Sequence, residues 1–132
     1  MSDVHARVPL LLASVFGAAG VALGAFGAHA LSGHFEANPS LQATYETAVQ
    51  YHLIHAAALL GTAALAAWMP SKWVRRAAWL FALGILLFSG SLYILSLANL
   101  RFMGAVAPFG GAALIAGWVS LGIGAWKINI KI

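Results

Sequence analysis

Four long apolar runs, separated by short polar seams, make up most of this chain. They extend over residues of about 8–31, 48–69, 77–98 and 105–126. Each run reaches the roughly 20 residues that a helix needs to cross a hydrocarbon core of about 30 Å. The runs lack the alternation of apolar and polar residues that is typical of transmembrane β-strands. The pattern therefore predicts an all-α membrane protein, a four-transmembrane-helix bundle formed by a single domain over residues 1–132.

The seam before the second run has a helical pattern of its own. Asn38-Pro39-Ser40 offers a helix start, with Ser40 as the N-cap. From there, six residues repeat at helical spacing and predict one shared face: Leu41, Tyr45, Ala48, His52, His55 and Leu59. We therefore expect the second helix to begin near Ser40, outside the membrane.

Composition and charge support a membrane location and indicate an orientation. Apolar residues make up 62% of the chain and charged residues only 8%, so the lipid bilayer is its expected solvent. Arg101 alone lies on one side of the predicted spans, whereas six basic residues lie on the other: Arg7, Lys72, Arg75, Arg76, Lys127 and Lys131. The positive-inside rule then places both termini in the cytoplasm. This topology accounts for the net charge of +4, and no nucleic-acid partner is expected.

Small residues in the first and fourth runs predict close helix packing. The glycines of the first run fall at alternating steps of three and four, which puts them on one stripe: Gly17, Gly20, Gly24 and Gly27. Such a stripe is either a homodimer seam or a packing surface within the bundle, and we favour the second interpretation. At the start of the fourth run, Pro108 suits a first helical turn, while Gly110 and Gly111 permit close backbone approach.

Polar residues inside the runs or at their edges gather in the half of the bundle that is predicted to face outward. The candidates are His29, Glu46, Tyr51, His52, His55, Ser89, Tyr93 and Ser96. Because buried polar groups are usually bonded, we expect a contact such as His55 to Tyr93 or to a serine hydroxyl to lock helices together. The alternative is a metal or haem site that uses His29, His52 and His55. We expect His5 and His34 to be solvated, and Trp118 to serve packing or lipid contact.

Four motifs, in order along the chain, resemble the small bacterial inner-membrane proteins of domain-of-unknown-function family 423. They are Gly24-Ala25-Phe26-Gly27-Ala28-His29-Ala30-Leu31, then Tyr45-Glu46-Thr47-Ala48-Val49-Gln50-Tyr51 leading into His55-Ala56, then Phe88-Ser89-Gly90-Ser91-Leu92-Tyr93, and Pro108-Phe109-Gly110-Gly111 with Ala116-Gly117-Trp118. The resemblance implies a multi-pass protein of the bacterial inner membrane, without an agreed biochemical activity. It also implies a set of family residues: His29, Glu46, Tyr51, His55, Ser89, Tyr93 and Pro108. His52 is not part of this set.

The sequence leaves three functional hypotheses. The first is a non-enzymatic structural or accessory subunit, in contact with lipid and with a larger membrane complex or a second copy of itself. The alternative is a redox protein that binds haem or a metal through His29 and His55. The third is a small-molecule transporter, which ranks last because the acidic residues lie outside or at the edge of the spans. We identify no catalytic residue and predict no bound cofactor.

Overall fold

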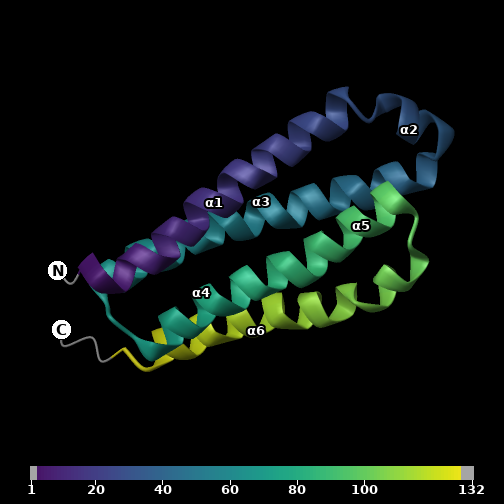
Figure 1. The fold of residues 1–132 in the computed structure, drawn as a ribbon. Coiled ribbons are helices and arrows are strands. Elements are labelled where there is room, and N and C mark those ends of the chain that lie inside the picture. The colour runs from purple at the N-terminus through teal and green to yellow at the C-terminus, as the bar shows by residue number, and fades with distance from the viewer. Residues whose placement is uncertain (1–2, 129–132) are drawn as a thin grey trace.

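The computed structural model describes residues 3–128 and is built from helices (Figure 1). In chain order these are α1 (Asp3–His29), α2 (Ser32–Ala37), α3 (Pro39–Trp68), α4 (Lys72–Gly84), α5 (Gly90–Ala98) and α6 (Ala107–Trp126). A π-helical turn, η1 (Ile85–Ser89), joins α4 to α5, and a 3₁₀ turn, η2 (Arg101–Ala105), precedes α6. Within the described residues, four helical segments are long and apolar enough to cross a membrane: Val4–His29, Pro39–Trp68, Lys72–Ala98 and Arg101–Trp126. The predicted all-α, four-span class is confirmed.

The spans are arranged as two helical pairs that meet along the middle of the molecule. α1 packs chiefly against α3, and α4 packs against α6, while α3 contacts α4 and α5 between them. Both ends of the described chain lie at one end of the bundle, opposite α2 (Figure 1). α1 meets α4 toward the end with the termini and diverges from the rest toward α2. α1 is therefore an edge helix of the bundle.

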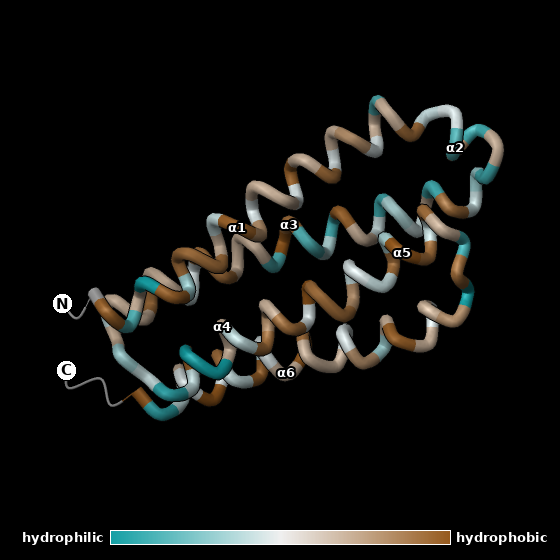
Figure 2. Tube along the Cα trace, viewed as in Figure 1, coloured by the Kyte–Doolittle hydropathy of each residue, from teal (hydrophilic) through white to brown (hydrophobic). Residues whose placement is uncertain are grey.

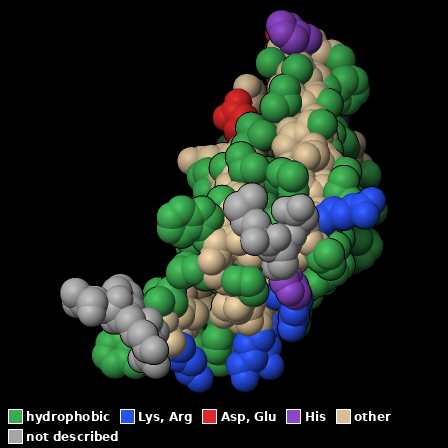
Figure 3. All heavy atoms as spheres, turned by 90° about the vertical axis from the view of Figure 1, so that its left-hand side faces the viewer, with side chains coloured by type: hydrophobic (Ala, Val, Ile, Leu, Met, Phe, Trp, Pro, Cys, Tyr) green, Lys and Arg blue, Asp and Glu red, His purple; other side chains and the backbone are tan. Residues whose placement is uncertain are grey.

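Charge is distributed unequally between the two ends of the bundle. Lys and Arg side chains gather at the end that carries the termini (Figure 3), while hydrophilic residues otherwise lie in the connections and at several positions along α3 (Figure 2). There Arg76 and Lys127 approach the ring centroid of Trp73 at 4.8 Å and 5.0 Å. Lys131 lies outside the described residues. We call the end with the termini the inner end, following the positive-inside rule, and the end with α2 the outer end.

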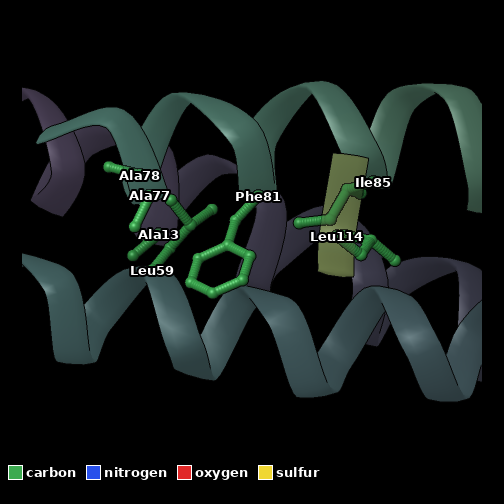
Figure 4. Packing of buried hydrophobic residues seen from close by; sticks show 7 residues of the cluster. All are labelled: Ala13, Leu59, Ala77, Ala78, Phe81, Ile85 and Leu114. Atoms are coloured by element: carbon green, nitrogen blue, oxygen red, sulfur yellow. The ribbon is translucent and has the colours of Figure 1, made fainter. Parts of the chain in front are cut away.

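One apolar cluster holds the four spans together toward the inner end. It contains seven buried residues, which Figure 4 shows in close contact: Ala13, Leu59, Ala77, Ala78, Phe81, Ile85 and Leu114. Glycines bring the backbones together here, because a Cβ on Gly117 would lie 2.6 Å from the ring of Phe81 and one on Gly84 would collide with Leu114. The cluster includes residues from α1, α3, α4, η1 and α6, so it fixes the positions of all the spans.

A second apolar cluster closes the outer end beneath α2. Phe35 of α2 packs against Tyr45, whose ring in turn lies 5.3 Å from that of Tyr93. α3 begins at Pro39 and extends well beyond the second apolar run. The six residues that share a face in the sequence are all buried on α3, from Leu41 to Leu59. Its outer turns thus belong to the packed bundle rather than to a loop.

The glycines of α1 face α3 along most of the predicted stripe. A Cβ on Gly20 would lie 2.7 Å from Leu53, one on Gly24 would lie 3.2 Å from Val49, and one on Gly27 would overlap Tyr45. Gly17 differs, because a Cβ added there would have no atom of the described residues within 4 Å. Gly20, Gly24 and Gly27 therefore pack within the bundle, whereas Gly17 borders open space.

The two glycines at the start of α6 differ in how closely they approach η1. A Cβ on Gly110 would collide with the backbone of Leu87 and Phe88 in η1, whereas one on Gly111 would meet the Phe88 ring at an ordinary 3.7 Å. Pro108 lies in the first turn of α6 and is exposed. The close approach between α6 and η1 is therefore made at Gly110.

Candidate functional site

Two hydrogen bonds join α3 to the third span in the outer half of the bundle. The Tyr93 hydroxyl and His52 Nδ1 lie 2.9 Å apart, and Ser89 Oγ donates to the carbonyl of Ala48 at 2.8 Å. All three side chains are buried. We expected His55 as the partner of Tyr93, but the rotation of α3 presents His52 to it instead. Sequence reasoning thus placed Tyr93 in the network and chose the wrong histidine.

His55 makes a separate pair of bonds, one of which connects α3 to α6. Its Nδ1 lies 2.7 Å from the carbonyl of Tyr51, and its Nε2 accepts from Trp118 Nε1–H at 3.0 Å. An indole nitrogen can only donate, so Nε2 must be the unprotonated nitrogen and Nδ1–H donates to the carbonyl. This arrangement requires the neutral ring. Trp118, for which we expected only packing or lipid contact, is thus a hydrogen-bond donor between spans.

The other ring nitrogen of His52 is buried without a hydrogen-bond partner among the described residues. The ring packs edge-on against Phe16 at 5.9 Å between centroids, and its Cδ2 lies 3.2 Å from the position that a Cβ on Gly20 would take. Gly20 therefore makes room for this histidine between α1 and α3. The feature of the sequence that could have indicated this contact is a glycine in the first run together with a histidine in the second.

Three of the remaining candidates have side chains at the surface, outside this buried network. His29 is exposed in the last turn of α1, and Tyr51 is exposed on α3 with its ring 4.7 Å from that of Phe88. Glu46 is also exposed and accepts a hydrogen bond from Gln42 at 3.0 Å. The eight predicted residues therefore do not form one site. The buried ones are His52, His55, Ser89, Tyr93 and Ser96, while His29, Glu46 and Tyr51 lie on the surface.

His34 is bonded rather than solvated, contrary to our expectation. α2 folds back over the outer end, and His34 Nε2 lies 2.8 Å from the carbonyl of Ser96. Ser96 Oγ in turn donates to the carbonyl of Tyr93 at 3.1 Å. The contact ties α2 to the third span, a long-range packing that the local pattern of a six-residue helix does not reveal.

The predicted metal ligands do not converge within the described part of the chain. No group of three or more His, Cys, Asp or Glu side chains there is placed to hold a metal ion. His29 lies at the exposed end of α1, while both ring nitrogens of His55 are engaged by Tyr51 and Trp118. Coordination by His55 would require the loss of one of these bonds.

A cleft that sequence reasoning missed opens between α1 and α3 at the outer end. It has a volume of about 410 Å³ and is lined by Gly24, Gly27, Ala28, Ser32, Phe35, Glu36, Gln42, Tyr45, Glu46, Val49 and Gln50. Glycine and aromatic residues form its apolar part, and two carboxylates and two amides supply its polar part. Over residues 3–128, no Lys or Arg lines it. The available signal was the placement of Glu36 and Glu46 on either side of one short outer connection.

Comparison with known proteins then places the chain in a family. Residues 23–111 match the family described as "Protein of unknown function (DUF423)". The UPF0382 membrane protein YwdK of Bacillus subtilis is 42% identical over 92% of this chain and 98% of its own length. The UPF0382 inner membrane protein YgdD of Escherichia coli is 39% identical over 95% of this chain and 94% of its own length. The chain belongs to the DUF423 family.

Membership of DUF423 agrees with the resemblance carried by the four motifs and with the four spans. Relatives over nearly the whole chain are named as membrane proteins, and YgdD as an inner membrane protein. The chain is accordingly a multi-pass protein of the inner membrane. No solved structure matches it. Because the family description states no activity, function has to be argued from the geometry.

Proposed function

We propose that this DUF423 protein is a non-enzymatic accessory subunit, which packs laterally against a larger membrane complex through α1. The observation that carries this proposal is the position of α1 at the edge of the bundle. Of the 18 residues in the apolar core of the first span, only 17% are buried within the bundle, compared with 39% in the second and third spans. α1 thus contributes more free surface to the membrane than either central span.

The free face of α1 has the composition of a helix-packing surface. Three small residues recur along it at steps of four and three, and all of them are exposed: Ala18, Ala22 and Ala25. At about 100° per residue, this stripe lies on roughly the opposite side of α1 from the glycines that pack on α3. Helices associate in lipid through close packing, for which small side chains are favoured. The stripe therefore suits a transmembrane helix of a partner.

The intramembrane polar groups support a structural role. Ser89 bonds to Ala48, Tyr93 to His52, and Trp118 to His55, and each bond connects two different spans. These contacts hold α3, α5 and α6 in register, which gives a partner a rigid body to pack against. This proposal assigns the buried network to helix registry and the interaction to the opposite side of α1.

Site-specific photocrosslinking in intact cells tests the proposal. A benzophenone amino acid is introduced at Ala18 or Ala22, and at the matched positions Ile115 and Val119, which are 66% and 54% exposed on α6. We expect both α1 positions to give one discrete adduct with the same larger membrane protein, and the α6 positions to give none. Ala18→Leu should remove the adduct formed from Ala22, since the larger side chain fills the surface.

Two results would overturn the proposal. An adduct of twice the mass of the chain, formed at both α1 positions, would identify a second copy as the partner instead of a larger complex. Equal labelling from α1 and α6, or no protein adduct from either, would show that lipid alone covers α1. Thermal melting of each variant in detergent establishes that the protein is folded in every arm.

A further inference from the structure

Two hollows lie one after the other along the same flank of the α1–α3 pair. The outer one is the cleft beside Glu36 and Glu46, and the second has a volume of about 360 Å³. The second is lined by Ala13, Ser14, Gly17, Val21, Leu53, Ala56, Ala57 and Leu60. Both are open to the outside of the bundle. Among the described residues, no other helix lies between the two hollows, and both open on the same side of the α1–α3 pair.

The residue spacing places the two hollows along one face of each helix. On α1 the lining residues step by four, three, four and three: Ala28, Gly24, Val21, Gly17 and Ser14. On α3 the same steps connect Glu46, Gln50, Leu53, Ala57 and Leu60. Steps of three and four follow a single face of a helix. We refer to this surface as the α1–α3 groove.

The α1–α3 groove changes from polar to apolar with depth. Glu36, Glu46 and Gln50 line its outer hollow, while the second hollow is apolar except for Ser14, whose hydroxyl donates to the carbonyl of Leu10 at 2.8 Å. The rise from Ser14 to Ala28 is about 21 Å at roughly 1.5 Å per residue. This exceeds the hydrocarbon depth of one leaflet, about 15 Å. A groove of this length and polarity matches one chain of a membrane lipid and its headgroup.

The charge of the outer hollow selects the kind of headgroup. Two of the three acidic residues of the chain, Glu36 and Glu46, line it, and no Lys or Arg of the described residues does so in either hollow. Glu46 accepts one hydrogen bond from Gln42, and a carboxylate has further acceptor capacity. An ammonium group, with three donors, complements these carboxylates, whereas a purely anionic headgroup would be repelled.

Space in the second hollow is suited to an acyl chain. Gly17 has no atom within 4 Å of the position of an added Cβ, although it lies between α1 residues that pack on α3. Ala57 is exposed on the opposite wall. Small residues on both walls thus leave room at the depth where lipid tails lie.

We propose that the α1–α3 groove binds an outer-leaflet aminophospholipid. The primary ammonium lies between Glu36 and Glu46, and one acyl chain lies along Gly17 and Ala57. This site is on the flank of α1 and does not require the partner complex of the proposed function. Lipid retention by the isolated protein therefore tests it separately from crosslinking in cells.

Native mass spectrometry of the detergent-purified chain measures the retention of added lipid. Phosphatidylethanolamine and phosphatidylglycerol with the same acyl chains are supplied in equal amounts, and we expect preferential retention of the first. Glu36→Gln and Glu46→Gln should each lower that retention by about fivefold, the effect of one interfacial charge contact. Arg101→Gln, which removes a charge from η2 on the same outer surface, is the matched control and should leave retention unchanged.

A second arm tests the chain portion of the groove. Gly17→Leu and Ala57→Leu add side chains into open or exposed positions, so both variants should fold and should retain less phosphatidylethanolamine. Water-soluble glycerophosphoethanolamine should not compete at equal concentration. Equal retention of the two phospholipids by the folded protein, or no loss in either glutamate variant, would overturn the headgroup assignment. Full competition by the soluble headgroup, or unchanged retention in both leucine variants, would overturn the acyl-chain assignment.

Discussion

The hydrogen bond from Trp118 to His55 joins the second span to the fourth inside the membrane. His55 is 5% exposed, and its other ring nitrogen bonds to the backbone of its own helix. Both polar atoms of the ring are thus engaged, and the rings of Phe81 and Tyr51 lie beside it. At this scale, a single side-chain hydrogen bond links two spans.

Trp118→Phe should destabilise the protein while preserving an aromatic ring at this position. We expect the free energy of unfolding to fall by about 0.6–1.7 kcal/mol, the range found for bonds between helices in membranes, since the change leaves His55 Nε2 without its donor. Reversible unfolding in mixed micelles measures the difference. Trp79→Phe is the matched control, because Trp79 is 55% exposed on α4. An equal loss in both variants would contradict a specific role for the bond.

The residues of the buried network could be selected from the sequence, but their partners could not. Depth along a helix follows from counting residues, so Tyr93 and the histidines were expected at similar levels. Which histidine meets Tyr93 depends on the rotation of α3 about its axis, and His52 and His55 share one face closely enough to make either possible. His34 was missed because its bond to Ser96 depends on how α2 folds back over the bundle.

At the scale of elements, the third span and α6 come into close contact through a π-helical turn on one and a glycine on the other. η1 widens the third span at Ile85–Ser89, and the backbone of Leu87 and Phe88 within it contacts Gly110 of α6. The sequence indicates two adjacent glycines suited to close approach. It does not reveal the π turn, which has no strong composition signal, and so it does not show which glycine makes the contact.

Gly110→Ala and Gly111→Ala form a matched pair that tests this contact. The added methyl group at Gly110 would overlap backbone atoms that cannot move independently, so we expect a loss of about 1–3 kcal/mol in the free energy of unfolding. At Gly111 the nearest atom is 3.7 Å away, and we expect little change or a slight gain. Thermal and denaturant unfolding of the two variants would show the difference. Similar melting temperatures would exclude a close contact at Gly110.

On the scale of the whole molecule, the bundle is tied together at its inner end and open along one flank at its outer end. The first apolar cluster draws residues from every span, whereas toward α2 the first span contacts mainly α3. The number of spans and their helical class follow from apolar runs of sufficient length, and for that reason they were predictable. The α1–α3 groove arises from the packing angle between two helices, and no local pattern expresses that angle.

The asymmetry of basic residues makes a prediction about orientation. A fluorescent protein fused after the last residue should be fluorescent, because it would fold in the cytoplasm. Alkaline phosphatase inserted between Ala37 and Asn38 should be active, because that connection would face outward. Cell fractionation and enzyme assays provide the readout. An inactive phosphatase at this position, with equal expression, would show that the six inner-side basic residues do not set the topology.

The π turn also changes the spacing of the core-facing residues along the third span. Four buried side chains mark its core-facing line, and they are Val74, Phe81, Ser89 and Ser96, with intervals of seven, eight and seven. The extra residue in the middle interval is absorbed by η1, so both α4 and α5 keep a face on α3. Excising the exposed Leu86 would restore an unbroken heptad, whereas excising the exposed Ile94 would turn every later residue by about 100°. The span therefore contains one position at which its length can change by a residue without loss of phase.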